Sequence, residues 1–237
     1  MIIINSALGQ SWTVWNEITE SGWGDSANTY IALMEGGLGA NETGQGAGLS
    51  GADLVLTQNG NIAASAGGMR ALDGTDDYFA FTAGLSDIII ARNTWTIIVK
   101  VGAMTAVNND RLFQMTDVGG NNNIIVSTDA VGCLIFYVSA GGVVALNNAQ
   151  TTDAAPAASD FWFWLAGDGT NTYGGWSTTM PSSHTAIAAA QRVQAATFTQ
   201  FATFDTGRAF GAASNGAIPS QFSPYYMIIS KSNLITY

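Results

Sequence analysis

The chain has 237 residues, with 7 Lys and Arg against 17 Asp and Glu, which gives a net charge of −10 at neutral pH. So few cations cannot form the basic face that a nucleic acid requires, and an anionic membrane surface would repel the chain, so we expect neither as a partner. The single cysteine, Cys133, excludes an intrachain disulfide framework and a multi-thiolate zinc site.

The first 28 residues differ from the rest and are predicted to form an extended N-terminal arm. Trp12, Trp15 and Trp23 stand there among polar and glycine residues, without a strand or helix period. Because burying an indole ring is favourable, we expect these three residues to attach the chain to a partner, either a second copy or another protein. The initial "MIIIN" has no basic region and does not resemble a signal peptide.

From residue 29 to residue 237 we expect one all-β domain. Short runs rich in β-branched and aromatic residues follow one another, most of them bounded by Gly, Asn, Asp or Pro, and they predict an antiparallel sandwich or barrel. The runs are 53–58, 76–82, 94–101, 111–116, 122–128, 133–139, 142–147, 160–167, 196–204, 208–213 and 225–230.

Two segments bear on how the strands are packed. In 94–101, Trp95, Ile97 and Val99 alternate with Thr96 and Ile98, which is the pattern of a strand with one buried and one solvated face. The alanine-rich segment 185–198 is compatible with a helix and equally with a loop followed by a strand.

The order of several motifs resembles a known family. "DGTDDYFAF" (73–81) resembles the DGxDDY signature of laminin-G-like domains, which belong to the concanavalin A-like lectin/glucanase superfamily and occur in phage virion surface proteins. "TWTIIVKV", "FWFWLAGDGT" and "FSPYYMIISKSNLIT" resemble the core strands that follow. The resemblance implies a jelly roll of two curved antiparallel sheets.

Three aspartates in this signature have more than one interpretation. Asp73 and Gly74 form a turn sequence, since glycine tolerates positive φ. Asp76 and Asp77 are best explained as carboxylates that bind backbone amides at the start of a strand. The resemblance also allows calcium at loop carboxylates, but a calcium ion needs several oxygen ligands, and we favour no cofactor. A catalytic role is the least favoured interpretation.

The arrangement of acids and of histidine argues against an enzyme. Glucanases of the superfamily carry two glutamates and an aspartate on one core strand, where they act as acid and nucleophile. The glutamates here, Glu17, Glu20, Glu35 and Glu42, all precede the core strands. The single histidine, His184, is expected in a solvated loop, where the adjacent serines are too close in sequence for a triad. We predict no catalytic residue and no metal ligand.

The aromatic residues are the better functional candidates. In 160–167, Phe161 and Phe163 share one face of the predicted strand, and Trp162 and Trp164 share the other. This pattern fits a central strand packed on both sides, a surface that stacks on sugars, or an interface between subunits. The candidate glycan or subunit surface comprises Trp162, Trp164, Asp168, Asn171, Tyr173 and Trp176.

Two functions are compatible with these features. The first is a non-enzymatic surface protein of a virus particle, of the phage head-decoration or fibre type. Such a protein would be made in the host cytoplasm and would bind the major capsid protein, another virion protein or its own copies, and also cell-surface glycans. The charged share of only 10% favours it, because few charges need desolvation on assembly. The alternative is a carbohydrate-binding lectin module of a bacterial surface or secreted protein.

Overall fold

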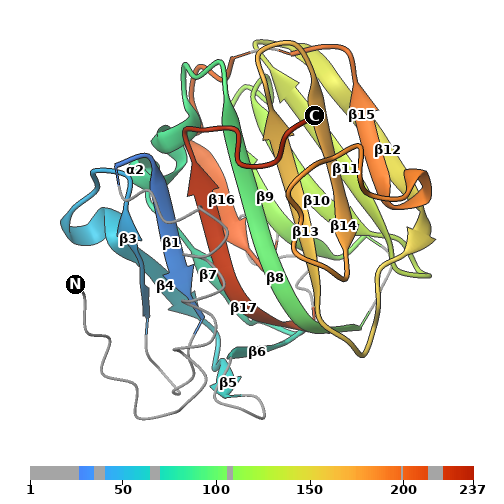
Figure 1. Cartoon of the computed structure of the whole chain (residues 1–237). Helices are drawn as coiled ribbons and strands as arrows, with labels where there is room; N and C mark the ends of the chain where they lie inside the picture. The colour runs from blue at the N-terminus through green and yellow to red at the C-terminus, as the bar shows by residue number, and fades with distance from the viewer. Residues whose placement is uncertain (1–26, 35–40, 65–69, 106–108, 199, 213–220) are drawn as a thin grey trace.

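The structure is a computed structural model that describes residues 27–34, 41–64, 70–105, 109–198, 200–212 and 221–237. Two antiparallel sheets pack face to face in this part of the chain (Figure 1). The predicted all-β jelly-roll sandwich is therefore confirmed. No helix of the described residues is long and apolar enough to cross a membrane.

We call the sheet that faces the viewer in Figure 1 the front sheet. Its strands are β1 (Thr29–Leu33), β3 (Gln45–Gly46), β5 (Ala63–Ala64), β6 (Arg70–Asp73), β8 (Trp95–Thr105), β13 (Phe161–Gly167), β14 (Thr172–Ser177), β15 (Arg192–Ala195) and β17 (Gln221–Ser230). The order is β15-β14-β13-β8-β17-β1-β3, with β6 paired to β17 and β5 paired to β6.

The back sheet lies behind it. Its strands are β2 (Glu42–Thr43), β4 (Val55–Asn59), β7 (Tyr78–Ala80), β9 (Arg111–Thr116), β10 (Asn123–Thr128), β11 (Cys133–Ala140), β12 (Val143–Ala154) and β16 (Thr206–Phe210), in the order β12-β11-β10-β9-β16-β7-β4-β2. The connections include four short helices, η1 (Gly51–Leu54), α2 (Ala83–Ser86), η2 (Asp87–Ile89) and η3 (Ala189–Gln191).

The main core lies between the two sheets. Phe163 of β13 and Val99 of β8 are directly paired neighbours that point into it, and Phe136 and Phe113 point into it from the back sheet. Each large apolar side chain buried here contributes about 1.5–3 kcal/mol. The alternation of apolar residues along each strand therefore fixes the register, because a slip of one residue would turn these side chains to the other face.

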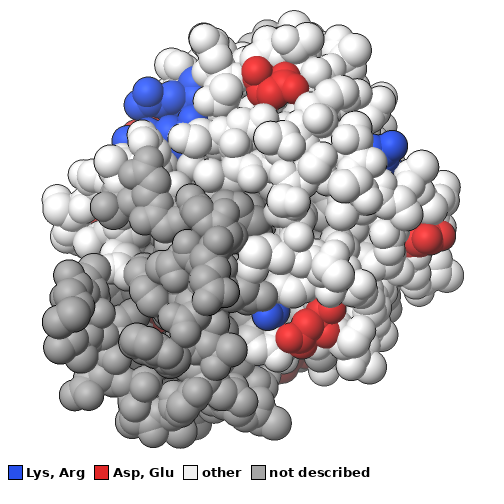
Figure 2. Space-filling view, in the orientation of Figure 1, with Lys and Arg blue, Asp and Glu red and all other residues white. Residues whose placement is uncertain are grey.

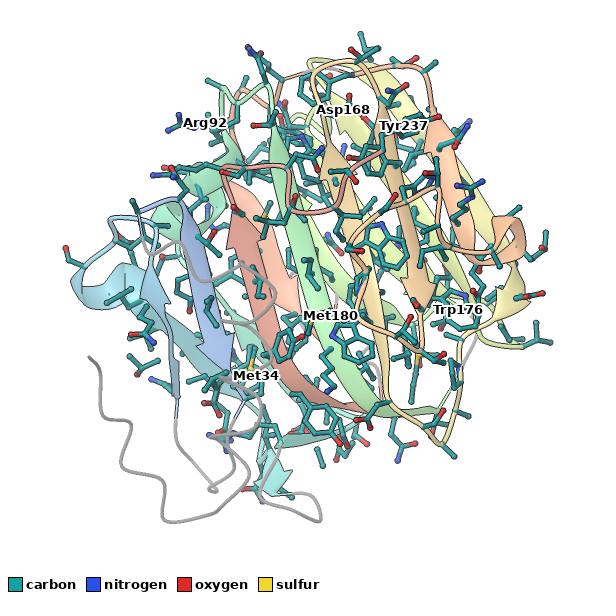
Figure 3. The ribbon with its side chains drawn as sticks, viewed as in Figure 1. Met34, Arg92, Asp168, Trp176, Met180 and Tyr237 are labelled. Carbon is teal, nitrogen blue, oxygen red and sulfur yellow. The ribbon has the colours of Figure 1, made fainter. Side chains whose placement is uncertain are left out.

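The front sheet is buried on its outer face as well, so the expectation of a half-solvated strand at 94–101 is wrong. Ile98 is fully buried in a second apolar cluster, which Met180, Ile187 and Leu234 help to cover (Figure 3 shows Met180 over this face). The hydroxyl of Thr96 donates to the carbonyl of Ser232, 2.9 Å away. The chain that follows β17 thus packs back over β8. Contacts between residues distant in sequence are therefore what buries both faces of β8.

Two other expectations are resolved. The alanine-rich segment forms a loop, the single turn η3 and the strand β15, so the loop-and-strand interpretation is confirmed. The strand expected at 196–204 is not present in its described residues. Phe201 and Phe204 are nevertheless buried in the main core, and Phe201 packs on Trp95 at 5.3 Å between ring centroids. The apolar pattern of 196–204 therefore reflects the contacts that an irregular segment makes with the core, and it does not mark a strand.

Candidate functional site

The aromatic rings expected to form a binding surface lie in the interior. Trp162 and Trp164 belong to the outer cluster of the front sheet together with Tyr173, and none of the three is more than 6% exposed. The indole N–H of Trp162 donates to the hydroxyl of Tyr226 at 2.6 Å, and the hydroxyl of Tyr173 donates to the carbonyl of Ile235 at 2.6 Å. The two-sided packing of 160–167 is confirmed, and these rings present no stacking surface to solvent.

Trp176 lies apart from that cluster, whereas Asp168 and Asn171 contact each other in a turn (Figure 3 labels Trp176 and Asp168). Trp176 is buried in the main core, where its N–H donates to the carbonyl of Asp153. Asp168 Oδ1 accepts the backbone N–H groups of Thr170 and Asn171 in the turn between β13 and β14. These hydrogen bonds hold the pKa of Asp168 below its ordinary value despite partial burial. Asp168 and Asn171 therefore stabilise a hairpin turn.

The three candidate attachment residues of the arm, Trp12, Trp15 and Trp23, lie outside the described residues. Attachment through them stays a prediction.

On the face seen in Figure 2 the described charged side chains occur in separate small groups.

The aspartates of the signature are brought together at the start of β7. Asp73, Asp76 and Asp77 each place one carboxylate oxygen within 4.8 Å of the others. Asp77 Oδ2 accepts the backbone N–H of Asp73 at 3.2 Å, and Asp73 Oδ1 accepts that of Thr75 at 2.7 Å. The interpretation of Asp77 as a carboxylate that binds a backbone amide is confirmed. Burial, and then the charge of Asp73, raise the pKa of Asp77.

His184 is not a solvated loop residue, contrary to the expectation. It is fully buried, and its ring stacks on Tyr237 at 5.6 Å and packs on Tyr173 at 4.9 Å. Burial lowers its pKa to about 4. The flanking Pro and Ser suggest a loop, and it is the chain end folding over β14 that buries the ring.

The outer face of the back sheet differs from that of the front sheet because its central strands are partly exposed. We call the outward positions of β9, β10 and β11 the open face. They are Arg111, Gln114, Thr116, Asn123, Ile125, Ser127, Ile135, Tyr137 and Ser139. Ile125, Ile135 and Tyr137 belong to neither apolar cluster and are each partly exposed. The open face therefore offers an aromatic ring and two aliphatic side chains to a ligand.

Polar groups surround these apolar side chains. Ile125 pairs with Tyr137 on one side and with Gln114 on the other, so an amide lies next to the apolar strip. Asn123 Nδ2 donates to the hydroxyl of Ser139 at 3.0 Å and to the carbonyl of Gly120 at 2.6 Å, which fixes a second amide. Asn123, Ser127 and Ser139 are buried, so the polar side chains that solvent reaches on this face are those of Arg111, Gln114 and Thr116. Together with the apolar strip they suit a ligand with both C–H faces and hydroxyl groups.

Arg111 supplies the cation of the open face. It pairs with Ser127, which pairs in turn with Ile135, so all three lie on one row across the strands. A register shift opposite Val126 and Ser127 puts Arg111 and Gln114 on the same face although they are three residues apart. Burial lowers the pKa of the Arg111 guanidinium below its ordinary value.

The sequence prediction missed the open face. Segment 133–139 is apolar at almost every position, so its periodicity does not reveal that Ile135 and Tyr137 point away from the core. The register shift in the pairing of β9 with β10 cannot be predicted from the sequence either. A usable signal was the pair Arg111 and Gln114, two long polar side chains in a strand whose Leu112, Phe113 and Met115 are apolar.

Comparison with known proteins gives likenesses of fold. No family model matches the sequence, and no curated protein matches it. Domain 4 of AbnA, an extracellular arabinanase from Geobacillus stearothermophilus solved in complex with arabinotriose, has a TM-score of 0.51 at 13% identity, over 74% of this chain and 77% of that chain. This likeness shows a shared β-sandwich fold.

Two sialidases contain a similar sandwich. Trypanosoma rangeli sialidase has a TM-score of 0.50 at 7% identity over 95% of this chain, and leech intramolecular trans-sialidase has 0.50 at 10% identity over 69%. The chain spans only 37% and 25% of their lengths. The fold is therefore shared with one part of these larger proteins.

Proposed function

We propose that this chain is a carbohydrate-binding β-sandwich domain that binds its ligand on the open face and does not cleave it. The observation that carries the proposal is the partly exposed strip of Ile125, Ile135 and Tyr137, bordered by the partly exposed polar side chains of Arg111, Gln114 and Thr116. A β-sandwich of the same fold, domain 4 of the arabinanase AbnA, is seen in complex with arabinotriose, which supports a sugar as the ligand class.

Binding without cleavage follows from the side chains of the open face. Glycoside hydrolysis uses a pair of carboxyl groups that flank the scissile bond. The outward positions of β9, β10 and β11 carry no Asp or Glu. Glu42, the one glutamate among the described residues, is buried in an ion pair with Arg70. The proposal agrees with the lectin alternative, and attachment to a virus particle is a separate prediction.

The test is a binding screen with site variants. Neutral and acidic oligosaccharides are titrated against the protein by calorimetry, and reducing ends are assayed on laminarin and lichenan. Tyr137→Ala should weaken binding at least tenfold, because it removes the ring of the strip. The matched control is Tyr78→Ala, since Tyr78 lies on β7 of the same sheet and is similarly exposed, four strands and about 19 Å away.

The expected result is saturable binding that Tyr137→Ala weakens and Tyr78→Ala leaves unchanged, with no release of reducing ends. Equal effects of the two substitutions would place the ligand elsewhere. Failure of the folded protein to bind any saccharide would overturn the proposal.

A further inference from the structure

Arg111 differs from the other six Lys and Arg residues of this chain, all of which lie in its described part. Five of the others have a partner on the protein. Arg70 pairs with Glu42, Lys100 with Asp160, Arg192 donates to the carbonyl of His184, Arg208 to those of Phe81 and Phe204, and Lys231 to that of Ala47. The sixth, Arg92, is exposed to water.

Arg111 is partly buried, and no described residue forms a hydrogen bond or ion pair with its guanidinium. Desolvating a cation without a counter-charge is unfavourable, so such a group is kept at a cost in stability. Because no described residue accepts from its five N–H donors, they can bind an external acceptor, and a planar carboxylate matches their geometry in two parallel hydrogen bonds.

The neighbouring carboxylates do not neutralise Arg111. Asp129 follows β10 on the same side, but its Oδ1 accepts two backbone N–H groups, from Val131 and Cys133, and its Oδ2 accepts the amide of Gln150 at 2.6 Å. Burial raises the pKa of the adjacent Asp110 to about 6, with no opposing effect of Arg111. The guanidinium therefore remains the one uncompensated charge among the outward side chains of β9, β10 and β11.

We propose, on the basis of the function proposed above, that the open face binds acidic sugars and that Arg111 binds their carboxylate. Arg111 and Ile135 lie on the same row two strands apart, about 10 Å, which is the span of a mono- or disaccharide. The sugar ring would lie over Ile125 and Ile135 beside Tyr137, with its carboxylate on Arg111 and its hydroxyls at Gln114. Because the net charge of −10 repels anions at a distance, the binding energy has to come from close contacts.

The experiment compares each acid with its own neutral derivative. Trigalacturonate and 3′-sialyllactose are titrated beside their methyl esters, which have the same shape without the charge, and the two acids distinguish a uronic from a sialic source. Wild-type protein should bind at least one acid tenfold or more tightly than its ester. Arg111→Gln should remove this difference, and Arg111→Lys should restore part of it, because an ammonium group keeps the charge and lacks the fork of donors.

Arg92→Gln is the matched control, since it removes the same charge from an exposed site. It should leave the preference for the acid unchanged, and melting curves establish that each variant is folded. Equal binding of acid and ester, or a preference that survives Arg111→Gln, would overturn the assignment of Arg111 and leave sugar binding intact. Absence of binding to every saccharide would overturn the proposed function itself.

Discussion

Nε2 of His184 lies 3.3 Å from Oε1 of Gln194, while Nδ1 of the same ring is buried and has no hydrogen-bond partner in the described part of the chain. The amide oxygen can only accept, so Nε2 carries the proton and Nδ1 is the bare acceptor nitrogen. Protonation of Nδ1 would place a buried cation between Tyr173 and Tyr237. The segment that covers the front sheet is therefore held by a neutral histidine.

The first prediction concerns stability in acid. The folded-state pKa of His184 is about 4, against an ordinary value of 6.5, so the unfolded chain takes up this proton first as the pH falls. Its contribution to stability is complete above pH 6.5 and is lost toward pH 4, a change on the order of 2–3 kcal/mol. His184→Phe keeps a ring and removes the titration. Urea unfolding at pH 4 to 8 should show that the free energy of unfolding falls less in acid for the variant than for the wild type. An identical dependence of this free energy on pH in the two proteins would contradict the prediction.

The second prediction has the opposite sign. Burial raises the pKa of Asp110 from 3.8 to about 6, so the folded protein binds this proton more tightly than the unfolded chain does. Asp110 therefore stabilises the fold below pH 3.8 and loses that contribution as the pH rises through 6. Asp110→Asn should raise the free energy of unfolding at pH 7 on the order of 1–2 kcal/mol and change it little at pH 4. Destabilisation at pH 7 would show that the carboxylate makes a favourable interaction when charged.

The strands of the sandwich could largely be predicted from local sequence. Alternation within 160–167 assigned Phe161 and Phe163 to one face and Trp162 and Trp164 to the other, and both assignments hold. Strand β14 gave no such signal, because Gly174 and Gly175 interrupt it. A Cβ at Gly175 would lie 2.5 Å from the carbonyl oxygen of Gln191 and 3.1 Å from the Cα of Arg192, so the close approach of the end of η3 and the start of β15 explains the glycine.

The exposure of each face could not be predicted, because it depends on contacts distant in sequence. Tyr173 is buried by Ile235, 62 residues further along, and nothing local to Tyr173 signals this. Conversely, Ile135 and Tyr137 are partly exposed and belong to neither apolar cluster of the described residues. The candidate residues Trp162, Trp164 and Tyr173 therefore lie on the front sheet, whereas Tyr137 of the open face lies on the back sheet.

The third prediction is that calcium contributes little to stability. Asp77 and Asp73 already accept backbone N–H groups at the turn, and a calcium ion takes six to eight oxygen ligands. Melting temperatures in EDTA and in millimolar CaCl₂ should agree within about one degree, since a ligand at 100 times its Kd would add about 2.7 kcal/mol. A rise of several degrees that calcium produces and magnesium does not would show that Asp73, Asp76 and Asp77 form a metal site.

The last prediction concerns the buried ion pair of Arg70 and Glu42, whose side chains are only 1% and 7% exposed. The Arg70 guanidinium also lies 6.0 Å from the ring centroid of Phe79. Removing one partner leaves the other charge desolvated, so Glu42→Gln should lower the free energy of unfolding by about 3–5 kcal/mol, whereas the double variant Glu42→Leu with Arg70→Met should recover most of that loss. The control is Asp160→Asn, which breaks the pair with Lys100 at 3.9 Å. Asp160 is 46% exposed, so its loss should cost less than about 1 kcal/mol. The free energies of unfolding are measured with urea at pH 7. If Glu42→Gln and Asp160→Asn lowered them equally, the prediction would be contradicted, and burial would not make Arg70 more dependent on its partner.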